Sequence, residues 1–190
     1  MTQTNLTQKA MFCCIAGTLI RTPQGDRPVE SLRPGDLVET FDGGSQSVTL
    51  VGSAQVAATG EAAPICLRAG TLGPHGPLFV SPLHRFMIRD SLAAMLFGDA
   101  EVLVAARDLV NGRSVTRLDG GLVDYQWLGF PVPQLIYAHG LITGSFPCSL
   151  ADFATAAAGP MPNPDDTSPV HDLRRVLRRF EAQVLMTAAA

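Results

Sequence analysis

The fold is decided by residues 13–38, which read CCIAGTLIRTPQGDRPVESLRPGDLV. Residues 18–22 are typical of a short β-strand, the Pro-Gln-Gly-Asp at 23–26 forms a turn, and residues 27–30 return beside the first run. A second turn, at 34–36, leads into another strand-like run at 37–40. Short strands joined by tight turns predict hairpins rather than helices.

The same pattern continues outward from this stretch to residue 138. Further short apolar runs lie at 47–56, 65–67, 78–80, 86–88, 101–104, 123–128 and 135–138. Because these runs are short, regularly spaced and not alternated with long helices, we expect an all-β sandwich or barrel-like fold. Residues 91–97 form either a helical insertion or a loop over the sheet, and 105–110 form one or two helical turns.

Composition limits the class of protein. The chain has 190 residues, enough for one domain or one domain with an appendage, and 46% of them are hydrophobic, enough for a sizeable core. The net charge of −3 gives no electrostatic reason to expect a nucleic-acid partner. The sequence has neither a signal peptide nor an apolar run long enough to span a membrane, so we expect a cytoplasmic location by default. We also expect a monomer.

The two ends of the chain differ from its middle. Residues 1–12 are polar and are expected to be a short leader before a domain over 13–146. Residues 147–169 are rich in proline and alanine and predict a linker. The apolar spacing in 170–187 predicts one amphipathic helix, carried by Val170, Leu173, Leu177, Phe180 and Val184. This helix either docks on the body with its arginines in solvent or binds a protein partner or an anionic surface.

The four cysteines do not form a disulfide framework. They include no Cys-x-x-Cys pair, and a chain of this length folds without disulfides, so we expect reduced thiols. Cys66 and Cys148 are expected to be packed or exposed thiols. A zinc site from Cys13, Cys14 and His84 is conceivable, but adjacent cysteines rarely bind one ion, and we expect neither a metal nor a cofactor. Of the other histidines, His75 is expected to lie in a loop, and His171 belongs to the tail.

Three motifs together resemble one known superfamily. Cys13 is followed at the right spacing by Gly-Thr-x-Ile, then by a Pro-x-Gly turn and a Val-Glu-x-Leu-x-Pro-Gly-Asp segment ending at residue 36. Residues 81–84 read Ser-Pro-Leu-His, and 125–146 look like closing strands. These features resemble the Hint (hedgehog/intein) superfamily, most of all its bacterial intein-like branch. The resemblance implies an all-β fold of many short strands with pseudo-twofold hairpins, plus a C-terminal helix.

The resemblance also implies an autoprocessing reaction. In that reaction Cys13 attacks the carbonyl of Phe12, and the peptide bond becomes a thioester. A thiol held in near-attack geometry, a proton donor for the departing nitrogen and donors for the oxyanion are needed. His84 would protonate the nitrogen of Cys13. Ser81, which stands where the family carries Thr, would orient or polarise the scissile peptide.

Two departures from the family pattern narrow the expected reaction. Inteins close with His-Asn, but residues 143–146 read Thr-Gly-Ser-Phe, so C-terminal cleavage and full splicing are not expected. The thioester would then be resolved by water or another nucleophile. In 127–134, Trp127 and two prolines replace the His, Asp and Glu that related chains often carry.

Two other readings stay open. The chain is either a Hint fold that has lost its chemistry and acts as a structural or partner-binding module, or a cysteine hydrolase that uses Cys13 and His84 on external substrates. The second is disfavoured because no third orienting residue is evident. Cys14 is expected to be structural, since alternation along an extended chain points it away from Cys13.

Overall fold

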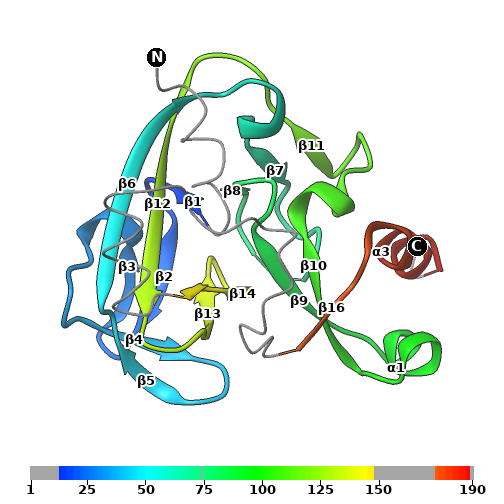
Figure 1. Ribbon diagram of the computed structural model, residues 1–190, viewed down its shortest axis with the longest axis horizontal. Coiled ribbons are helices and arrows are strands. Elements are labelled where there is room, and N and C mark those ends of the chain that lie inside the picture. The colour runs from blue at the N-terminus through cyan, green and yellow to red at the C-terminus, as the bar shows by residue number, and fades with distance from the viewer. Residues whose placement is uncertain (1–12, 74, 148–173, 189–190) are drawn as a thin grey trace.

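The computed structural model describes residues 13–73, 75–147 and 174–188. Figure 1 shows two β-sheets that cross the molecule, with the helices α1 and α3 together at one end. The described residues are mainly β-strand, and most pairings are antiparallel. The all-β prediction is therefore confirmed.

The first sheet carries the start of the described chain. Its strands, in the order in which they pair, are β11 (Val115–Arg117), β7 (Ile65–Leu67), β8 (Leu78–Val80), β1 (Cys14–Ile15), β12 (Leu122–Phe130) and β15 (Phe146–Pro147), and β6 (Leu50–Ala57) also pairs with β12. Strand β1 lies between β8 and β12, with Cys14 opposite Val80 on one side and Gln126 on the other. The short β1 is thus held on both edges, which fixes the direction of its side chains.

The second sheet contains the hairpins expected from residues 13–38. Its strands, in order, are β16 (Arg175–Val176), β10 (Glu101–Ala105), β9 (Arg85–Arg89), β14 (Leu141–Gly144), β13 (Leu135–Ala138), β2 (Leu19–Thr22) and β3 (Gly25–Pro28), while β4 (Leu37–Thr40) pairs with both β13 and β5 (Gly44–Ser47). The β2–β3 and β4–β5 pairs are antiparallel hairpins. The predicted turn at 23–26 therefore joins β2 to β3. The predicted turn at 34–36 leads into β4, and the β4–β5 hairpin closes through residues 41–43.

Residues 91–97, which the sequence left undecided, form a helix. Helix α1 (Ser91–Phe97) begins after Asp90, whose carboxylate accepts a hydrogen bond from the Leu92 N–H at 2.8 Å, and ends at Gly98 in the left-handed conformation. These are the capping residues that start and stop helices. Three short 3-10 helices, η2 (Val29–Ser31), η3 (Gly60–Ala62) and η4 (Ala106–Leu109), complete the connections. The last of them is the predicted turn at 105–110.

The C-terminal helix is shorter than the pattern in 170–187 predicted. Helix α3 (Arg179–Ala188) begins after strand β16, which pairs in parallel with β10, and residues 170–173 lie outside the described part. Because the chain first extends along β10, the helix starts later and turns a different face inward. Ala182 and Leu185 of the helix are buried, as is Leu177, two residues before it begins. Phe180 and Val184 are exposed.

A glycine of β6 makes room for the only tryptophan. Gly52 lies opposite Trp127 in the β6–β12 ladder, and a Cβ at this position would lie 2.2 Å from the indole ring. Replacing Gly52 with Val should therefore displace the indole, move tryptophan fluorescence to longer wavelength and cost about 1 kcal/mol of stability. Ser53→Val, on the exposed neighbour, should leave the emission unchanged. An unaltered spectrum in Gly52→Val would contradict this packing.

Candidate functional site

The backbone of Cys13 makes two hydrogen bonds, through its N–H and through its carbonyl, to one residue that directly follows β8. The N–H of Cys13 donates to Ser81 Oγ at 3.1 Å, and the N–H of Ser81 donates to the Cys13 carbonyl at 2.9 Å. Both residues are buried. Ser81 thus contacts the nitrogen of the predicted scissile peptide, while Phe12, which supplies its carbonyl, lies outside the described residues.

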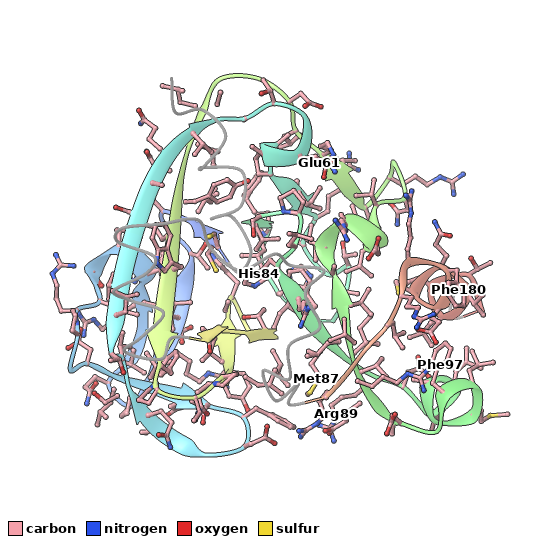
Figure 2. All side chains as sticks on the ribbon, in the orientation of Figure 1. Glu61, His84, Met87, Arg89, Phe97 and Phe180 are labelled. Carbon is pink, nitrogen blue, oxygen red and sulfur yellow. The ribbon has the colours of Figure 1, made fainter. Side chains whose placement is uncertain are left out.

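His84 is placed by a tight turn that begins at Ser81. Its N–H donates to the Ser81 carbonyl at 3.1 Å, and its own carbonyl accepts from the N–H of Ala106 at 2.8 Å. The ring is 1% exposed and its edge faces Phe86, with the ring centroids 5.3 Å apart. Figure 2 shows His84 in the interior of the molecule. The turn therefore begins at the residue that is hydrogen-bonded to Cys13 and directs His84 into the interior.

The imidazole of His84 is neutral in this environment. Burial lowers the pKa of His84 from 6.5 to about 3, and neither ring nitrogen has a hydrogen-bond partner in the described part of the chain. Buried polar atoms normally have partners, so this ring is costly for the fold. A neutral imidazole has one donor and one acceptor nitrogen. It can therefore supply a proton only if it also receives one.

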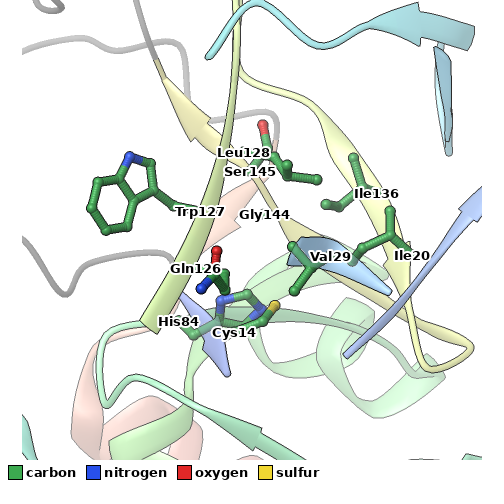
Figure 3. A pocket seen from close by; sticks show the side chains of 10 residues that line it. All are labelled: Cys14, Ile20, Val29, His84, Gln126, Trp127, Leu128, Ile136, Gly144 and Ser145. Atoms are coloured by element: carbon green, nitrogen blue, oxygen red, sulfur yellow. The ribbon is translucent and has the colours of Figure 1, made fainter. Parts of the chain in front are cut away.

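A buried pocket brings the imidazole of His84 together with Cys14. Figure 3 shows both side chains at one end of it, near Gln126 and Val29. Its lining residues are Cys14, Ile20, Val29, His84, Gln126, Trp127, Leu128, Ile136, Gly144 and Ser145. Cys13 does not belong to this set. The histidine thus shares its pocket with the second cysteine rather than the first.

The thiol of Cys14 is that of a core residue. Burial raises its pKa to about 12, and a hydrogen bond with the Thr18 side chain opposes this shift. The side chain packs with the apolar residues of β2, η2 and β12, among them Ile20 and Leu128. A thiol that stays protonated at neutral pH is a poor nucleophile. These surroundings agree with the structural role expected for Cys14.

The side chain of Cys13 lies on the other face of β1. It packs in a separate cluster with Tyr125 and Trp127 of β12 and Val56 of β6. Successive side chains of a strand point to opposite faces, so Cys13 and Cys14 diverge. This arrangement excludes a zinc site that uses both thiols. Within 13–73, 75–147 and 174–188, no three residues of metal-binding type are grouped to hold an ion.

The neutral state of His84 predicts a loss of stability in acid. The unfolded chain takes up this proton near pH 6.5, but the folded protein takes it up only near pH 3. Stability is therefore lost as the pH falls through this window, by at most about 1.4 kcal/mol per pH unit. Urea unfolding across the window should show a shallower loss for His84→Leu than for wild type. Parallel profiles of the two proteins would contradict this assignment.

The remaining sequence candidates are less informative. Cys66 on β7 is partly exposed, and burial raises the pKa of its thiol while Arg68 opposes the shift. His75 Nε2 accepts a hydrogen bond from the N–H of Leu72 at 3.3 Å, as befits a loop residue. Cys148 and His171 lie outside the described residues. Among the helices of the described residues, none has both the length and the apolar character that a membrane crossing requires.

Two buried residues near the site were missed by sequence reasoning. Tyr125 is 1% exposed, packs with Cys13, and donates from its hydroxyl to the Ala62 carbonyl at 2.9 Å. Thr143 lies opposite Phe86 in the β14–β9 ladder, and its hydroxyl is buried without a partner in the described residues. The alternation of residues 123–128 puts Tyr125 and Trp127 on one face, but it does not show that this face meets Cys13.

Comparison with known proteins agrees with this architecture. Residues 12–149 match the model of the family described as Hint domain. The solution structure of a bacterial intein-like domain from Clostridium thermocellum superposes with a TM-score of 0.52 at 14% identity, covering 72% of this chain and 99% of that one. At this identity the likeness shows the fold alone. No curated protein sequence matches the chain.

Solved inteins are also similar. A splice-inactive variant of the AceL NrdHF class 3 split intein has a TM-score of 0.47 at 15% identity, covering 72% of this chain and 98% of that one. The MchDnaB-1 intein has a TM-score of 0.47 at 13% identity, covering 70% and 99%. The family match spans most of the chain, and the resemblance seen in its motifs is thereby confirmed. This protein belongs to the Hint domain family and has the all-β, intein-like fold of those autoprocessing domains, extended by a C-terminal helix.

Proposed function

We propose that this Hint domain cleaves its own chain by an N–S acyl shift at the Phe12–Cys13 bond. The sulfur of Cys13 attacks the Phe12 carbonyl carbon, the new C–S bond forms as the C–N bond breaks, and the thiol proton ends on the freed amine. The observation that carries this proposal is the pair of hydrogen bonds between Ser81 and the Cys13 backbone. They hold the amide nitrogen that must leave and the residue that must attack.

Ser81 prepares the amide for this reaction. Its hydroxyl accepts from the Cys13 N–H, which fixes the orientation of the peptide whose nitrogen must leave. The hydrogen bond from the Ser81 N–H to the Cys13 carbonyl fixes the other end of the same residue, so the backbone of Cys13 is held at both its nitrogen and its carbonyl. Such positioning lowers the entropic part of the barrier.

His84 acts as a proton carrier in this proposal. The ring passes the thiol proton to the nitrogen of Cys13 as the C–N bond breaks. Burial lowers the pKa of the ring to about 3, so the ring is a weak base and its protonated form is a strong acid that gives the proton up at once. This role is supported by the bond from the His84 N–H to the carbonyl of Ser81, the residue that contacts the Cys13 amide. The thiol lies on the opposite face of β1, so the transfer passes through water or through the peptide itself rather than by direct contact.

The thioester is then resolved without splicing. Residues 143–146 hold no Asn that could cyclise, so the second step is attack on the thioester by water or another nucleophile. Water adds its oxygen to the Phe12 carbonyl, the C–S bond breaks, and the sulfur regains a proton. The products are the segment that ends at Phe12 and a chain that begins with Cys13. Each molecule reacts once.

Intact-mass spectrometry tests the reaction directly. Wild-type protein is incubated in buffer alone, with dithiothreitol and with hydroxylamine, and heat-denatured protein serves as the control of identical sequence. The folded protein should give the fragment of residues 13–190, and with hydroxylamine the peptide 1–12 should carry a hydroxamate. If the folded chain stays whole under all three conditions, the proposed reaction is refuted.

A second candidate function is a Hint fold without chemistry that serves as a structural or partner-binding module. One observation favours it: Cys13 packs beside Trp127, an apolar side chain in the segment where related chains often carry polar groups. An uncleaved chain in the mass experiment, with a Cys13 that reacts with iodoacetamide no faster than a thiol peptide, would favour this candidate.

A further inference from the structure

Two side chains of the described residues hold buried polar atoms without a hydrogen-bond partner, the imidazole of His84 and the hydroxyl of Thr143. Both side chains are almost completely shielded, with 1% and 0% of their surface exposed. Burying such atoms without a partner costs free energy, and native proteins rarely do so. If the two groups lie close together, one further molecule can serve as the partner of both.

The register of β14 places Thr143 on the same side of the sheet as His84. Thr143 pairs with Phe86 of β9 on one edge and with Ile136 of β13 on the other. Residues that pair directly point to the same face of a sheet. Phe86 is the residue whose ring meets the ring of His84, and Ile136 lines the pocket that holds His84. The hydroxyl of Thr143 therefore lies between a contact of the imidazole and a wall of its pocket.

The pocket has the size of one water molecule. It offers about 10 Å³ to the centre of a water-sized sphere, which is room for a single water. Gly144 and Ser145, which follow Thr143 in the chain, form part of its wall, as Figure 3 shows. The hydroxyl oxygen of Ser145 already accepts a hydrogen bond from the Gln134 N–H at 2.9 Å. A buried water needs two to four polar partners, and the imidazole and the Thr143 hydroxyl provide two.

We propose that one water molecule in this pocket bridges a ring nitrogen of His84 and the hydroxyl of Thr143, which makes Thr143 a positioning residue for His84. A neutral imidazole has one donor and one acceptor nitrogen, and water and a hydroxyl can each donate and accept, so the bridge satisfies both groups. With one nitrogen held, the ring keeps a single orientation and tautomer, and its other nitrogen remains for the Cys13 amide.

This role rests on the proposed acyl shift and adds one residue to it. Catalytic nucleophile and base pairs commonly include a third group that orients the base. The sequence revealed no such group beside Cys13 and His84. Thr143 fills this place through the water, because its own hydroxyl has no direct hydrogen bond to the imidazole.

Thermal unfolding of Thr143→Val tests the bridge without relying on cleavage. Valine keeps the shape of threonine but lacks the hydroxyl. If the hydroxyl holds the bridging water, its removal should lower the melting temperature, because the water loses a partner. The same change made in His84→Leu should not lower it, because the bridge is already broken there. A melting temperature that rises or stays the same in the wild-type background, or that falls equally in both backgrounds, would refute the bridge.

Nitrogen-15 NMR of the histidine rings measures the effect on His84 itself. The His84 signals are those that His84→Leu lacks. They should have the shifts of one tautomer in wild type and move to the average of two tautomers in Thr143→Val, and Thr143→Ser should restore them. Thr22→Val is the matched control, because it removes a buried threonine hydroxyl that donates to the Gly25 carbonyl. His84 shifts that are the same in Thr143→Val and wild type would contradict the positioning of the ring.

The cleavage assay then tests whether this positioning matters for the reaction. In Thr143→Val, thioester formation followed by dithiothreitol cleavage should slow about tenfold, the factor that corresponds to one neutral hydrogen bond. Thr143→Ser should regain most of the wild-type rate. Altered ring shifts with an unchanged rate overturn the positioning role. If wild type is never cleaved, the acyl shift fails and the role of Thr143 in it fails too, whereas the melting temperatures and ring shifts still decide whether the bridge exists.

Discussion

We expect the Cys13→Ala protein to keep its full mass under dithiothreitol and hydroxylamine, while Cys14→Ala protein is cleaved at close to the wild-type rate. The first change removes the only sulfur that can attack the Phe12 carbonyl in the proposed reaction. The second removes a thiol whose pKa is raised to about 12 and which packs in the core. We therefore predict that cleavage is lost completely in Cys13→Ala and stays close to the wild-type rate in Cys14→Ala.

The Cys14→Ala protein should instead show a defect in stability. Removing a buried sulfur from the cluster around Ile20 and Leu128 leaves a small cavity, at a cost of about 1 kcal/mol. Thermal unfolding of the two variants measures this. Because Cys14 shares its pocket with His84, the reverse result has a defined meaning. A fragment that begins at Cys14 would show that the bond between the two cysteines is the one cut.

The second large effect concerns His84. Replacing His84 with Leu should slow cleavage about 100-fold, at the lower end of what a positioned acid–base group contributes. Stability at neutral pH should stay the same or rise, because the change removes two buried nitrogens that lack partners in the described residues. Loss of activity together with undiminished stability separates a chemical role from a structural one.

His139→Asn provides the matched control for that variant. His139 has a φ of 48° in the turn between β13 and β14, a conformation that Asn tolerates, and it does not line the pocket. Its cleavage rate should equal that of wild type. A His84→Leu protein that is cleaved as fast as this control would exclude His84 from the reaction.

The local pattern of the sequence predicted most of the fold. The strands around 18–22, 37–40 and 65–67 and the two early turns follow from β-branched and apolar runs between proline and glycine. Helix α1 was left undecided because its seven residues are too few to establish a helical period. The late start of α3 could not be predicted, since it depends on a pairing with β10 that is remote in sequence.

The candidate site was predicted by motif and not by geometry. The motif placed Ser81 three residues before His84. The tight turn that joins them and the hydrogen bonds between Ser81 and Cys13 are seen only in the structure. The face on which each side chain lies depends on the register of β1 against β12, which no local pattern encodes. For this reason the neighbour of the Cys13 thiol, Tyr125, became visible only in three dimensions.

The pairing of β16 with β10 also bears on where this domain ends. The family match stops at residue 149, yet Leu177, Ala182 and Leu185 are buried against the side chains of η4 and α1. A protein shortened to that boundary would leave the outer strand β10 unpaired on that side and an apolar surface open to water, both of which promote aggregation. The last stretch of the chain is therefore part of the folding unit, and any version prepared for solution work must keep it.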